Sequence, residues 1–486
     1  MARSHLERIT SGIDGLDEVL QGGFIKGGLY IIEGAPGTGK TILANQICFH
    51  HAKARKSVLY VTLIAETVGR MLLNIGSMLF FDETAVGAGI FYISGFNALK
   101  NEGLTGLLHL LRREVAARDA AILMIDGFAS ASDSAHSPEE LKVFVQQLQT
   151  QADAADCTVF LLTNPIETKP SSEETMVDGI INLASVVRNY SAMRELHVRK
   201  FRGSFHLEGI HNYHIGQAGI TVYPRIETQV RHLPSDNGHV RRVSSGITRL
   251  DSMIGGGIPE RTMTMLVGPS GTGKTTAGLQ FLAQASSDEP GLLFSFYETP
   301  ARIRIKAQMF PPFVEALDAG HIEIMWQPPS EWLLDELAVH LFEAVRRRGV
   351  RRLLLDGLAG FKKALRSRPM EPFFSALVEE LCRLGVTSIC TAEAAEIIGP
   401  TITTPLGGLS DVTDNHILLR FIEIGARLYR IMSILKVRDS SFDSNLREFS
   451  ITDHGIEIAN DSASAELVLA STRRTRPPEL TVSENK

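Results

Sequence analysis

The sequence has few cysteines, and none of them are paired at the spacing of a metal site. It contains 4 cysteines in 486 residues, which lie far apart or inside apolar runs, without a Cys-x-x-Cys pair. This pattern argues against a disulfide-stabilised scaffold and against the common structural zinc sites. We therefore expect buried, reduced thiols and no metal held by cysteine or histidine.

Long apolar runs and an excess of positive charge are also missing. No apolar run approaches the roughly 18–20 residues that a membrane helix needs. The basic residues at the amino terminus are not followed by the apolar segment of a secretory signal. We therefore expect a cytoplasmic protein without a membrane partner. The formal net charge of −6 gives no overall attraction for nucleic acid.

The chain is too long for one hydrophobic core. Its 486 residues, 44 % hydrophobic and 21 % charged, describe an ordinary globular composition. Because domains usually contain about 100–200 residues, two domains of similar size are the natural division.

An internal repeat supports that division. GAPGTGKT at residues 34–41 recurs as GPSGTGKT at 268–275, and ITSGIDGLDEVLQGGF (9–24) matches VSSGITRLDSMIGGGI (243–258). Further matching segments follow in the same order, so one domain has been duplicated.

The repeat and the composition together predict the domain boundaries. We expect an N-terminal domain over residues 1–228, a C-terminal domain over 229–461 and a flexible tail over 462–486. Residues 224–242 hold two prolines and a Ser-Asp-Asn-Gly cluster with little apolar periodicity, which is typical of a linker.

Short apolar runs alternate with longer helical patterns in each half. LYIIEG, VLYVTL, ILMID and TVFLLT have the composition of buried parallel strands, and residues 416–438 suggest an antiparallel pair. This order predicts an α/β fold in both domains, each a mainly parallel, doubly wound sheet extended by antiparallel edge strands.

The repeated glycine loop is a phosphate-binding pattern. Its glycines let backbone N–H groups surround phosphate oxygens, its lysine reaches the β and γ phosphates, and its threonine offers a hydroxyl to magnesium. A chance glycine-rich turn does not explain two such loops in register. We therefore expect ATP and Mg²⁺ as cofactors, with both lysines also counted as catalytic. The candidate binding residues are Gly34, Gly37, Thr38, Gly39, Lys40, Thr41, Gly268, Gly271, Thr272, Gly273, Lys274 and Thr275.

Two further pairs of acidic residues complete the candidate catalytic set. Asp126 and Asp356 end apolar strands, where magnesium-organising carboxylates stand in such ATPases. We predict that they act on the metal with Thr41 and Thr275; the alternative is that each caps a helix. Hydrolysis also needs a group that orients the attacking water. The candidates at the end of the strand after the loop helix, where a merely solvated glutamate is the alternative, are Glu66 and Glu298.

As a set, these motifs resemble the KaiC family of circadian-clock ATPases and kinases. The resemblance covers about residues 5–460, including both SGI-x-x-LD openings, both loops, both Asp strands and LREFSITDHGIEI (446–458). It implies two tandem RecA-like P-loop NTPase domains in a hexameric ring, with ATP bound between neighbouring subunits. It also implies slow ATP hydrolysis by the N-terminal domain and autophosphorylation of a Ser/Thr pair by the C-terminal domain.

The resemblance further implies that one subunit completes its neighbour's nucleotide site. A Lys-x-Arg strand end makes that contact in the family, and it matches Lys200 with Arg202 and Lys436 with Arg438. An arginine supplied in this way can be worth about 10³–10⁵ in rate. The alternative is a surface basic pair on an edge strand.

The sequence departs from the family pattern at the proposed base. The family usually has two adjacent glutamates, whereas this chain has Ala65-Glu66 and Tyr297-Glu298. Because neighbouring strand residues face opposite sides, losing the first glutamate can leave no carboxylate aimed at the water. Either a twist of the strand end compensates, or catalysis is slow. We expect measurable but weak ATP hydrolysis, because the lysine, threonine and aspartate set is intact.

A second departure concerns the phosphoacceptor. Where the family has Ser-Thr, this chain has Ser410 followed by Asp411. Asp411 carries one negative charge, against about −1.5 to −2 for a phosphate, so it imitates the modified state only in part. Ser410 is the candidate phosphoacceptor, with a turn or cap residue as the alternative.

Two other functions stay open at this point. A DNA-dependent motor is suggested by the basic segment GFKKALRSRP (360–369), although the loop over 399–410 has no basic or aromatic residue for bases to stack on. A catalytically weak, nucleotide-gated scaffold is suggested by the missing glutamates and by an Arg-rich tail that could recruit protein regulators.

Overall fold

The computed structural model divides the chain into two compact units, Met1–Gln229 (unit 1) and Val230–Lys486 (unit 2). The structure describes residues 6–64, 68–165, 175–188, 191–229, 241–308, 310–328, 332–365, 368–394, 409–424 and 427–460.

Unit 1 is built around a nine-stranded sheet with the order β11-β10-β9-β8-β3-β7-β6-β4-β5. Six neighbouring strands of this order, β8, β3, β7, β6, β4 and β5, are parallel. Strands β9, β10 and β11 extend the sheet by antiparallel pairing. A separate two-stranded sheet pairs β1 (Arg8–Ile9) with β2 (Phe24–Ile25). The large sheet contains β3 (Leu29–Gly34), β4 (Val58–Thr62), β5 (Ile90–Ser94), β6 (Ile122–Asp126), β7 (Thr158–Thr163), β8 (Gly179–Arg188), β9 (Ser191–Phe201), β10 (Ile210–Gly216) and β11 (Gly219–Tyr223).

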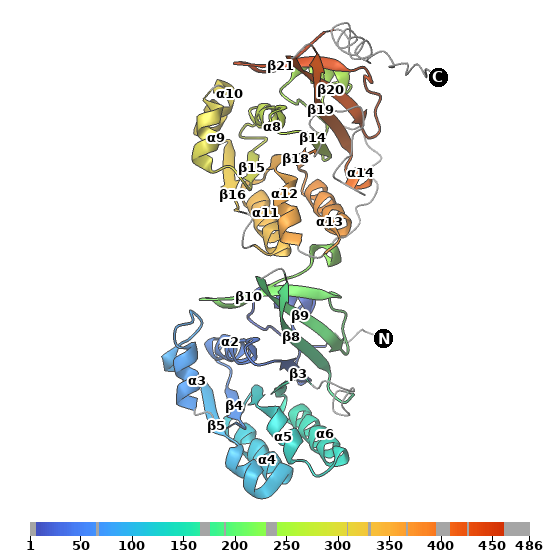
Figure 1. Ribbon diagram of the computed structural model, residues 1–486. Coiled ribbons are helices and arrows are strands. Elements are labelled where there is room, and N and C mark those ends of the chain that lie inside the picture. Colours follow the sequence, from blue (N-terminus) through green and yellow to red (C-terminus); the bar gives the residue numbers. More distant parts are fainter. Residues whose placement is uncertain are drawn as a thin grey trace, which may run out of the picture. The chain divides into compact units, whose positions relative to one another are not determined.

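Helices cover both faces of this sheet (Figure 1). Helices α1, α2 and α3 pack on one face around Phe24, Tyr60 and Phe160, whereas α4, α5 and α6 pack on the other around Leu107, Phe128 and Phe144. The helices are α1 (Leu16–Val19), α2 (Lys40–Lys53), α3 (Val68–Ile75), α4 (Phe96–Arg118), α5 (Phe128–Ser134) and α6 (Pro138–Ala155), with 3-10 turns η1 (Glu83–Ala85) and η2 (Ile226–Thr228).

Unit 2 repeats this architecture. Its nine-stranded sheet has the order β16-β15-β17-β18-β14-β19-β20-β21-β22, and β12 (Arg242–Val243) pairs with β13 (Ile258–Pro259) in a small sheet. Strands β20, β21 and β22 form the antiparallel extension. The large sheet contains β14 (Met263–Gly268), β15 (Gly291–Ser295), β16 (Ile322–Trp326), β17 (Arg352–Asp356), β18 (Thr387–Glu393), β19 (Asn415–Ile424), β20 (Arg427–Lys436), β21 (Arg447–Thr452) and β22 (Gly455–Ile458).

The helices of unit 2 also lie on two faces. Phe281 and Phe313 belong to the core on the α8 side, whereas Phe361 of α12 packs edge-on against Phe374 of α13 on the other side. The helices are α7 (Thr248–Met253), α8 (Lys274–Leu282), α9 (Pro300–Ala307), α10 (Pro311–Asp318), α11 (Leu334–Arg348), α12 (Leu358–Leu365), α13 (Met370–Arg383) and α14 (Leu409–Val412). The predicted fold class, two tandem doubly wound α/β domains with antiparallel edge strands, is therefore confirmed.

The central strands form because their sequences suit burial on both faces. All six residues of β3 and all six of β14 are buried, as expected for continuous apolar runs in a parallel sheet with helices on both sides. Local signals fix the helix starts. Ser137 caps α6 by accepting a hydrogen bond from the Glu140 backbone N–H at 3.2 Å, and Pro138 occupies the first turn.

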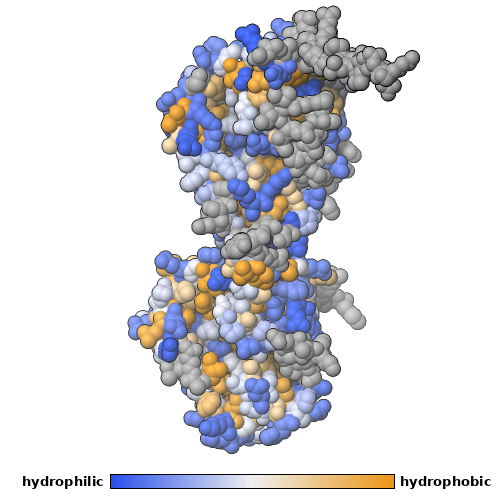
Figure 2. Space-filling view, viewed as in Figure 1, coloured by the Kyte–Doolittle hydropathy of each residue, from blue (hydrophilic) through white to orange (hydrophobic). Residues whose placement is uncertain are grey.

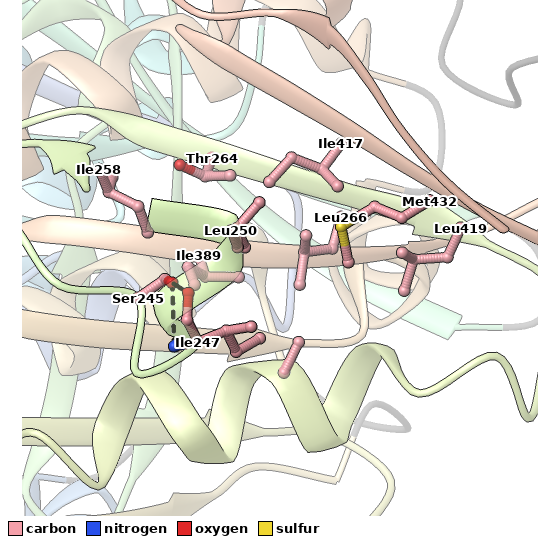
Figure 3. A pocket seen from close by; sticks show the side chains of 11 residues that line it. Ser245, Ile247, Leu250, Ile258, Thr264, Leu266, Ile389, Ile417, Leu419 and Met432 are labelled. Carbon is pink, nitrogen blue, oxygen red and sulfur yellow. Dashed lines mark hydrogen bonds between the residues drawn. The ribbon is translucent and has the colours of Figure 1, made fainter. Parts of the chain in front are cut away.

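A small cavity in unit 2 is lined in part by Thr264 and Leu266 of β14 (Figure 3). Its volume is about 10 Å³, and its lining is mostly aliphatic. The hydroxyl of Ser245 is already engaged with the backbone of Ile247, accepting from its N–H at 3.2 Å. A water needs several polar partners in such a space, so this cavity is a packing gap in the core and not a ligand site.

No helix within the described part of the chain is long and apolar enough to cross a membrane. On the face drawn in Figure 2, hydrophilic residues cover much of both units, with small groups of hydrophobic residues between them.

Candidate functional site

Each glycine loop joins the central strand of its sheet to the following helix. Helix α2 begins at Lys40 directly after β3, and α8 begins at Lys274 directly after β14, with only the loop between. The residues before these helices, Gly39 and Gly273, have φ angles of 96° and 104°, which residues with a side chain rarely adopt. The first N–H groups of each helix have no partner within the helix and face the loop, an arrangement that binds anions.

The first glycine of each loop is required by a close backbone approach. A Cβ atom on Gly34 would lie 2.5 Å from the carbonyl oxygen of Leu183, and one on Gly268 would lie 2.4 Å from that of Leu419. Thr38 and Thr272 hold the loop from within, because each hydroxyl donates at 2.8 Å to a carbonyl three residues earlier. Both loops thus have the same internal bonding.

The two loop lysines fold back over their own loops. Lys274 Nζ donates to the carbonyl oxygens of Gly268 and Pro269, both at 2.7 Å, and Lys40 Nζ contacts the equivalent carbonyl of Gly34. Burial lowers the pKa of both lysines from its ordinary value, because the site desolvates the ammonium groups. A phosphate at the loop would satisfy these charges better than the carbonyl oxygens do.

In unit 1 the loop threonine faces the strand-end aspartate. The hydroxyl of Thr41 donates to Asp126 Oδ2 at 3.4 Å, and the Tyr60 hydroxyl donates to the same oxygen at 2.7 Å. Burial raises the pKa of Asp126, although both hydrogen bonds act in the opposite direction. A cation beside this buried carboxylate would offset its desolvation.

Unit 2 has the same arrangement with a different second donor. Thr275 Oγ1 lies 3.2 Å from Asp356 Oδ2, and Thr391 Oγ1 donates to Asp356 Oδ1 at 2.7 Å. Burial again raises the pKa of the aspartate. One hydroxyl and one carboxylate fit Mg²⁺, which takes oxygen ligands and keeps several waters and phosphate oxygens. Thr41, Asp126, Thr275 and Asp356 are thus the residues that would hold the metal.

A hollow of about 370 Å³ adjoins the unit 2 loop. It is lined by loop residues, by Asp356 and by Glu298, so the predicted phosphate, metal and base residues of unit 2 face one space. Its size is within the range of small-molecule sites, about 300–1,000 Å³.

Of the two candidate bases, Glu298 lies in the described part of the chain and Glu66 lies outside it. Glu298 forms an ion pair through Oε1 with Lys306 of α9, and its Oε2 is buried without a hydrogen-bond partner among the described residues. That oxygen can still accept a hydrogen bond from a water. The residue before it, Tyr297, is 46 % exposed and lies under the Lys363 ammonium, 5.2 Å from the ring centre.

The Lys-x-Arg pairs lie at the amino-terminal ends of the parallel strands, whereas the loops lie at the carboxyl-terminal ends. Phe201, between Lys200 and Arg202, pairs with Gly179, which in turn pairs with Tyr30 near the start of β3. The loop begins at the other end of β3, about 13 Å away at about 3.3 Å per residue. Lys200 and Arg202 instead contact the carbonyl oxygen of Thr175, at 3.1 and 2.7 Å.

Unit 2 places its pair in the same way. Lys436 pairs with His416 at the start of β19 and donates to the Thr413 carbonyl at 2.9 Å. Arg438 forms an ion pair with Asp414 at 2.7 Å and remains 65 % exposed. Neither pair can reach the phosphate loop of its own unit.

Ser410 lies in α14, just before the start of β19, and so also at the amino-terminal ends of the parallel strands of unit 2. Its backbone is described but its side chain is not. The following Asp411 is exposed. Ser410 is therefore also separated from the phosphate loop of its own unit.

The basic segment that suggested DNA binding is largely engaged within unit 2. Lys363 lies over Tyr297, and Arg368 forms an ion pair at 2.5 Å with the fully buried Asp335. Arg366 lies outside the described residues.

The structure adds site residues that the sequence did not single out. Tyr60 and Thr391 donate hydrogen bonds to Asp126 and Asp356, and Lys306 forms an ion pair with Glu298. Asn164, at the end of β7, lies 3.4 Å from the Lys40 ammonium, and Glu393 stands at the corresponding end of β18. Their sequence signal is weak, since it is only a polar residue at the end of an apolar strand.

Comparison with known proteins finds one domain twice. A family model described as "ATPase: KaiC" matches residues 9–227 and again residues 243–463. The circadian clock oscillator protein KaiC of Rippkaea orientalis is 24% identical over 494 residues, covering 99% of this chain and 93% of that protein. KaiC of Synechococcus elongatus is 24% identical over 500 residues, with 99% and 93% covered. KaiC of a Picosynechococcus species is 22% identical over 479 residues, with 96% and 92% covered.

The raised pKa of Asp356 predicts that Asp356→Asn stabilises nucleotide-free unit 2. An unfolded aspartate has a pKa of about 3.9. Because the folded value is higher, the folded chain holds the proton more tightly, and stability falls as pH rises from the unfolded to the folded value. At pH 7 the substitution removes this cost, so the melting temperature should rise; in a domain of this size each 1 kcal/mol corresponds to about 2–4 °C.

Thermal unfolding at pH 7 and pH 4, without nucleotide and with a chelator, checks this expectation. The gain should shrink at pH 4, and the exposed Asp453→Asn variant should show none. A lower melting temperature for Asp356→Asn at pH 7 would contradict the account.

Proposed function

We propose, because the chain belongs to the KaiC family of ATPases, that it is a Mg²⁺-dependent ATPase and autokinase that assembles into a nucleotide-dependent hexameric ring. Two KaiC domains and the ATPase activity follow from family membership. The metal, the kinase activity, the ring and a role in clock-type or other regulation are the proposed parts. Kinship with clock oscillator proteins motivates the last of these.

One observation carries the proposal. In each unit the phosphate loop lies at the carboxyl-terminal ends of the parallel strands, and the Lys-x-Arg pair lies at their amino-terminal ends. A chain with this arrangement cannot complete its own sites, but a neighbouring chain can supply the basic pair to each loop. A closed ring satisfies this requirement for every subunit, because head-to-tail contacts with the correct rotation close into a ring.

The mechanism of hydrolysis follows from the residues around the loop. Backbone N–H groups of the loop and Lys274 would hold the phosphates, and Mg²⁺ on Thr275 and Asp356 would neutralise charge on the phosphate oxygens. Glu298 would orient the attacking water through its unpartnered oxygen. The ion pair with Lys306 restrains the other oxygen, which fits slow turnover.

We expect Glu298→Gln to lower ATP turnover by unit 2 by about 10²–10⁴, the usual contribution of a positioned base. The measurement is made in a Lys40→Ala background, so that unit 1 does not contribute. Lys306→Asn is the matched control. It introduces the residue that unit 1 has at the equivalent position, since Lys306 is the seventh residue of α9 and Asn74 is the seventh residue of α3. This variant frees Glu298 Oε1 but leaves the carboxylate in place, so turnover should be at least as fast as that of the parent chain. Unchanged turnover in Glu298→Gln would remove that residue from the mechanism.

The ring predicts a change of mass with nucleotide. In Mg-ATP, light scattering should give six times the chain mass of 53.2 kDa. A combined Arg202→Ala, Arg438→Ala variant should hydrolyse ATP at least about 10³-fold more slowly if both arginines act across subunits. A single-chain mass at micromolar protein in Mg-ATP would defeat the assignment of all four basic residues.

Ser410 is proposed as the phosphoacceptor. It lies at the same strand ends of unit 2 as Lys436 and Arg438, so it would receive phosphate from ATP bound to the neighbouring chain. The exposed Asp411 beside it supplies a permanent negative charge at the second acceptor position of the family.

Intact-mass analysis after incubation with Mg-ATP should show one added phosphate per chain, and Ser410→Ala should abolish it. The reverse outcome, an unmodified wild-type chain or a modified Ser410→Ala chain, would exclude Ser410 as the acceptor. Asp411→Asn is the control for local charge and should still accept phosphate.

A further inference from the structure

A groove of about 400 Å³ lies between α4 and α6 of unit 1. These helices pack side by side on one face of the sheet (Figure 1). Its floor is apolar and includes Leu111, Leu148 and Val159. Cys157 adds to this floor, because burial raises the pKa of its thiol to about 12 and keeps it uncharged at neutral pH. The groove is therefore large enough and apolar enough for a small molecule.

The groove is remote from the nucleotide. Leu123 and Val159 are the second residues of β6 and β7, so the groove lies at the amino-terminal ends of these parallel strands. The phosphate loop and Asp126 lie at the carboxyl-terminal ends. Nothing in the ATPase mechanism uses this space.

The corresponding place in unit 2 is filled by side chains. Helix α4 of unit 1 corresponds to α11 of unit 2, and α6 corresponds to α13. Residues with positive φ fix the alignment: Asp119 and Gly349 follow α4 and α11, and Asp156 and Gly385 stand at the ends of α6 and α13. In unit 2, Arg346 forms an ion pair with Glu380 at 2.7 Å and covers the ring of the buried Phe342.

Unit 1 has a smaller or uncharged residue at each of the closing positions. Ala116 stands where unit 2 has Arg346, Gln151 where it has Glu380, and Ala155 where it has Leu384. All three line the groove. The opening thus results from loss of the interhelical ion pair and of one leucine, on an otherwise repeated scaffold.

Arg112 gives the groove its charge. It is the single charged residue among the described lining residues, and it takes the place of Phe342 of unit 2. No hydrogen bond or ion pair links it to the described part of the chain, whereas its neighbours Arg113 and Arg118 both pair with Glu114. The last turns of α4 and α6 each add a partial negative charge, about half a unit, and Arg118 lies in the last turn of α4. Arg112 supplies the one full charge of a side chain among the described lining residues, and that charge is positive.

From this geometry we propose that unit 1 has a second ligand site, distinct from the nucleotide site, for a small organic anion with an apolar body, such as a medium-chain carboxylate. The apolar body lies on the floor between α4 and α6. The carboxylate meets the Arg112 guanidinium at the mouth, where a two-pronged pairing is available.

Calorimetric titration of the full-length chain with decanoate, decanol and decylammonium tests the site. Decanoate should bind one molecule per chain, decanol more weakly, and decylammonium most weakly. Ala155→Leu, and separately Ala116→Arg with Gln151→Glu, introduce the unit 2 residues and should weaken decanoate at least about tenfold by filling the groove. Arg112→Gln should weaken decanoate but not decanol, and the adjacent Arg113→Gln should change neither.

Absence of decanoate binding to the wild-type chain would overturn the proposal, as would binding that both closing variants retain. Equal binding of decanoate and decylammonium would overturn the assigned charge of the ligand. Arg112→Gln alters an exposed side chain, so it keeps the test decisive if a closing variant fails to fold, which its thermal unfolding would reveal.

Discussion

The tight turn between the central strand and the first long helix of each unit is the constraint on which the rest depends. Gly34 and Gly268 must lack a side chain because a neighbouring strand's carbonyl lies where Cβ would stand, and Gly39 and Gly273 must adopt positive φ. Burial of β3 and β14 on both faces holds this turn in place. The helix N–H groups, the lysine and the threonine then face one volume without further adjustment.

The sheet separates two kinds of chemistry by the two ends of its parallel strands. The residues proposed to hold phosphate, metal and the attacking water gather at the carboxyl-terminal ends of the parallel strands, because those ends meet on one side of the sheet. The basic pairs and Ser410 lie at the amino-terminal ends of those strands, and in the proposed ring a neighbouring chain brings them to the loops. Duplication preserved this division, while single positions diverged. Lys306 of unit 2 occupies the position of Asn74 in unit 1. The ion-paired Arg346 and Glu380 occupy the positions of Ala116 and Gln151.

Much of the fold could be predicted from sequence because its signals are local. Apolar runs ending in a glycine loop or an aspartate specify strand, turn and helix in order, and the repeat specifies two copies. Thr391 could not be predicted in the same way. It reaches Asp356 only because β18 lies between β14 and β17 in the sheet, and this neighbourhood is a property of strand order. Lys306 likewise contacts Glu298 through the placement of α9. The groove of unit 1 exists because Ala116 and Ala155 are too small to fill the space between α4 and α6. That space is defined only once the two helices are packed on the sheet.

The central claim is that both loops hold nucleotide in the same chain. Equilibrium binding of a slowly hydrolysed ATP analogue with Mg²⁺, counted per chain, tests it most directly. The account predicts two nucleotides for the wild-type chain, one for Lys40→Ala, one for Lys274→Ala and none for the double variant. A wild-type chain that binds one nucleotide, or a Lys40→Ala chain that still binds two with unchanged affinity, would contradict it.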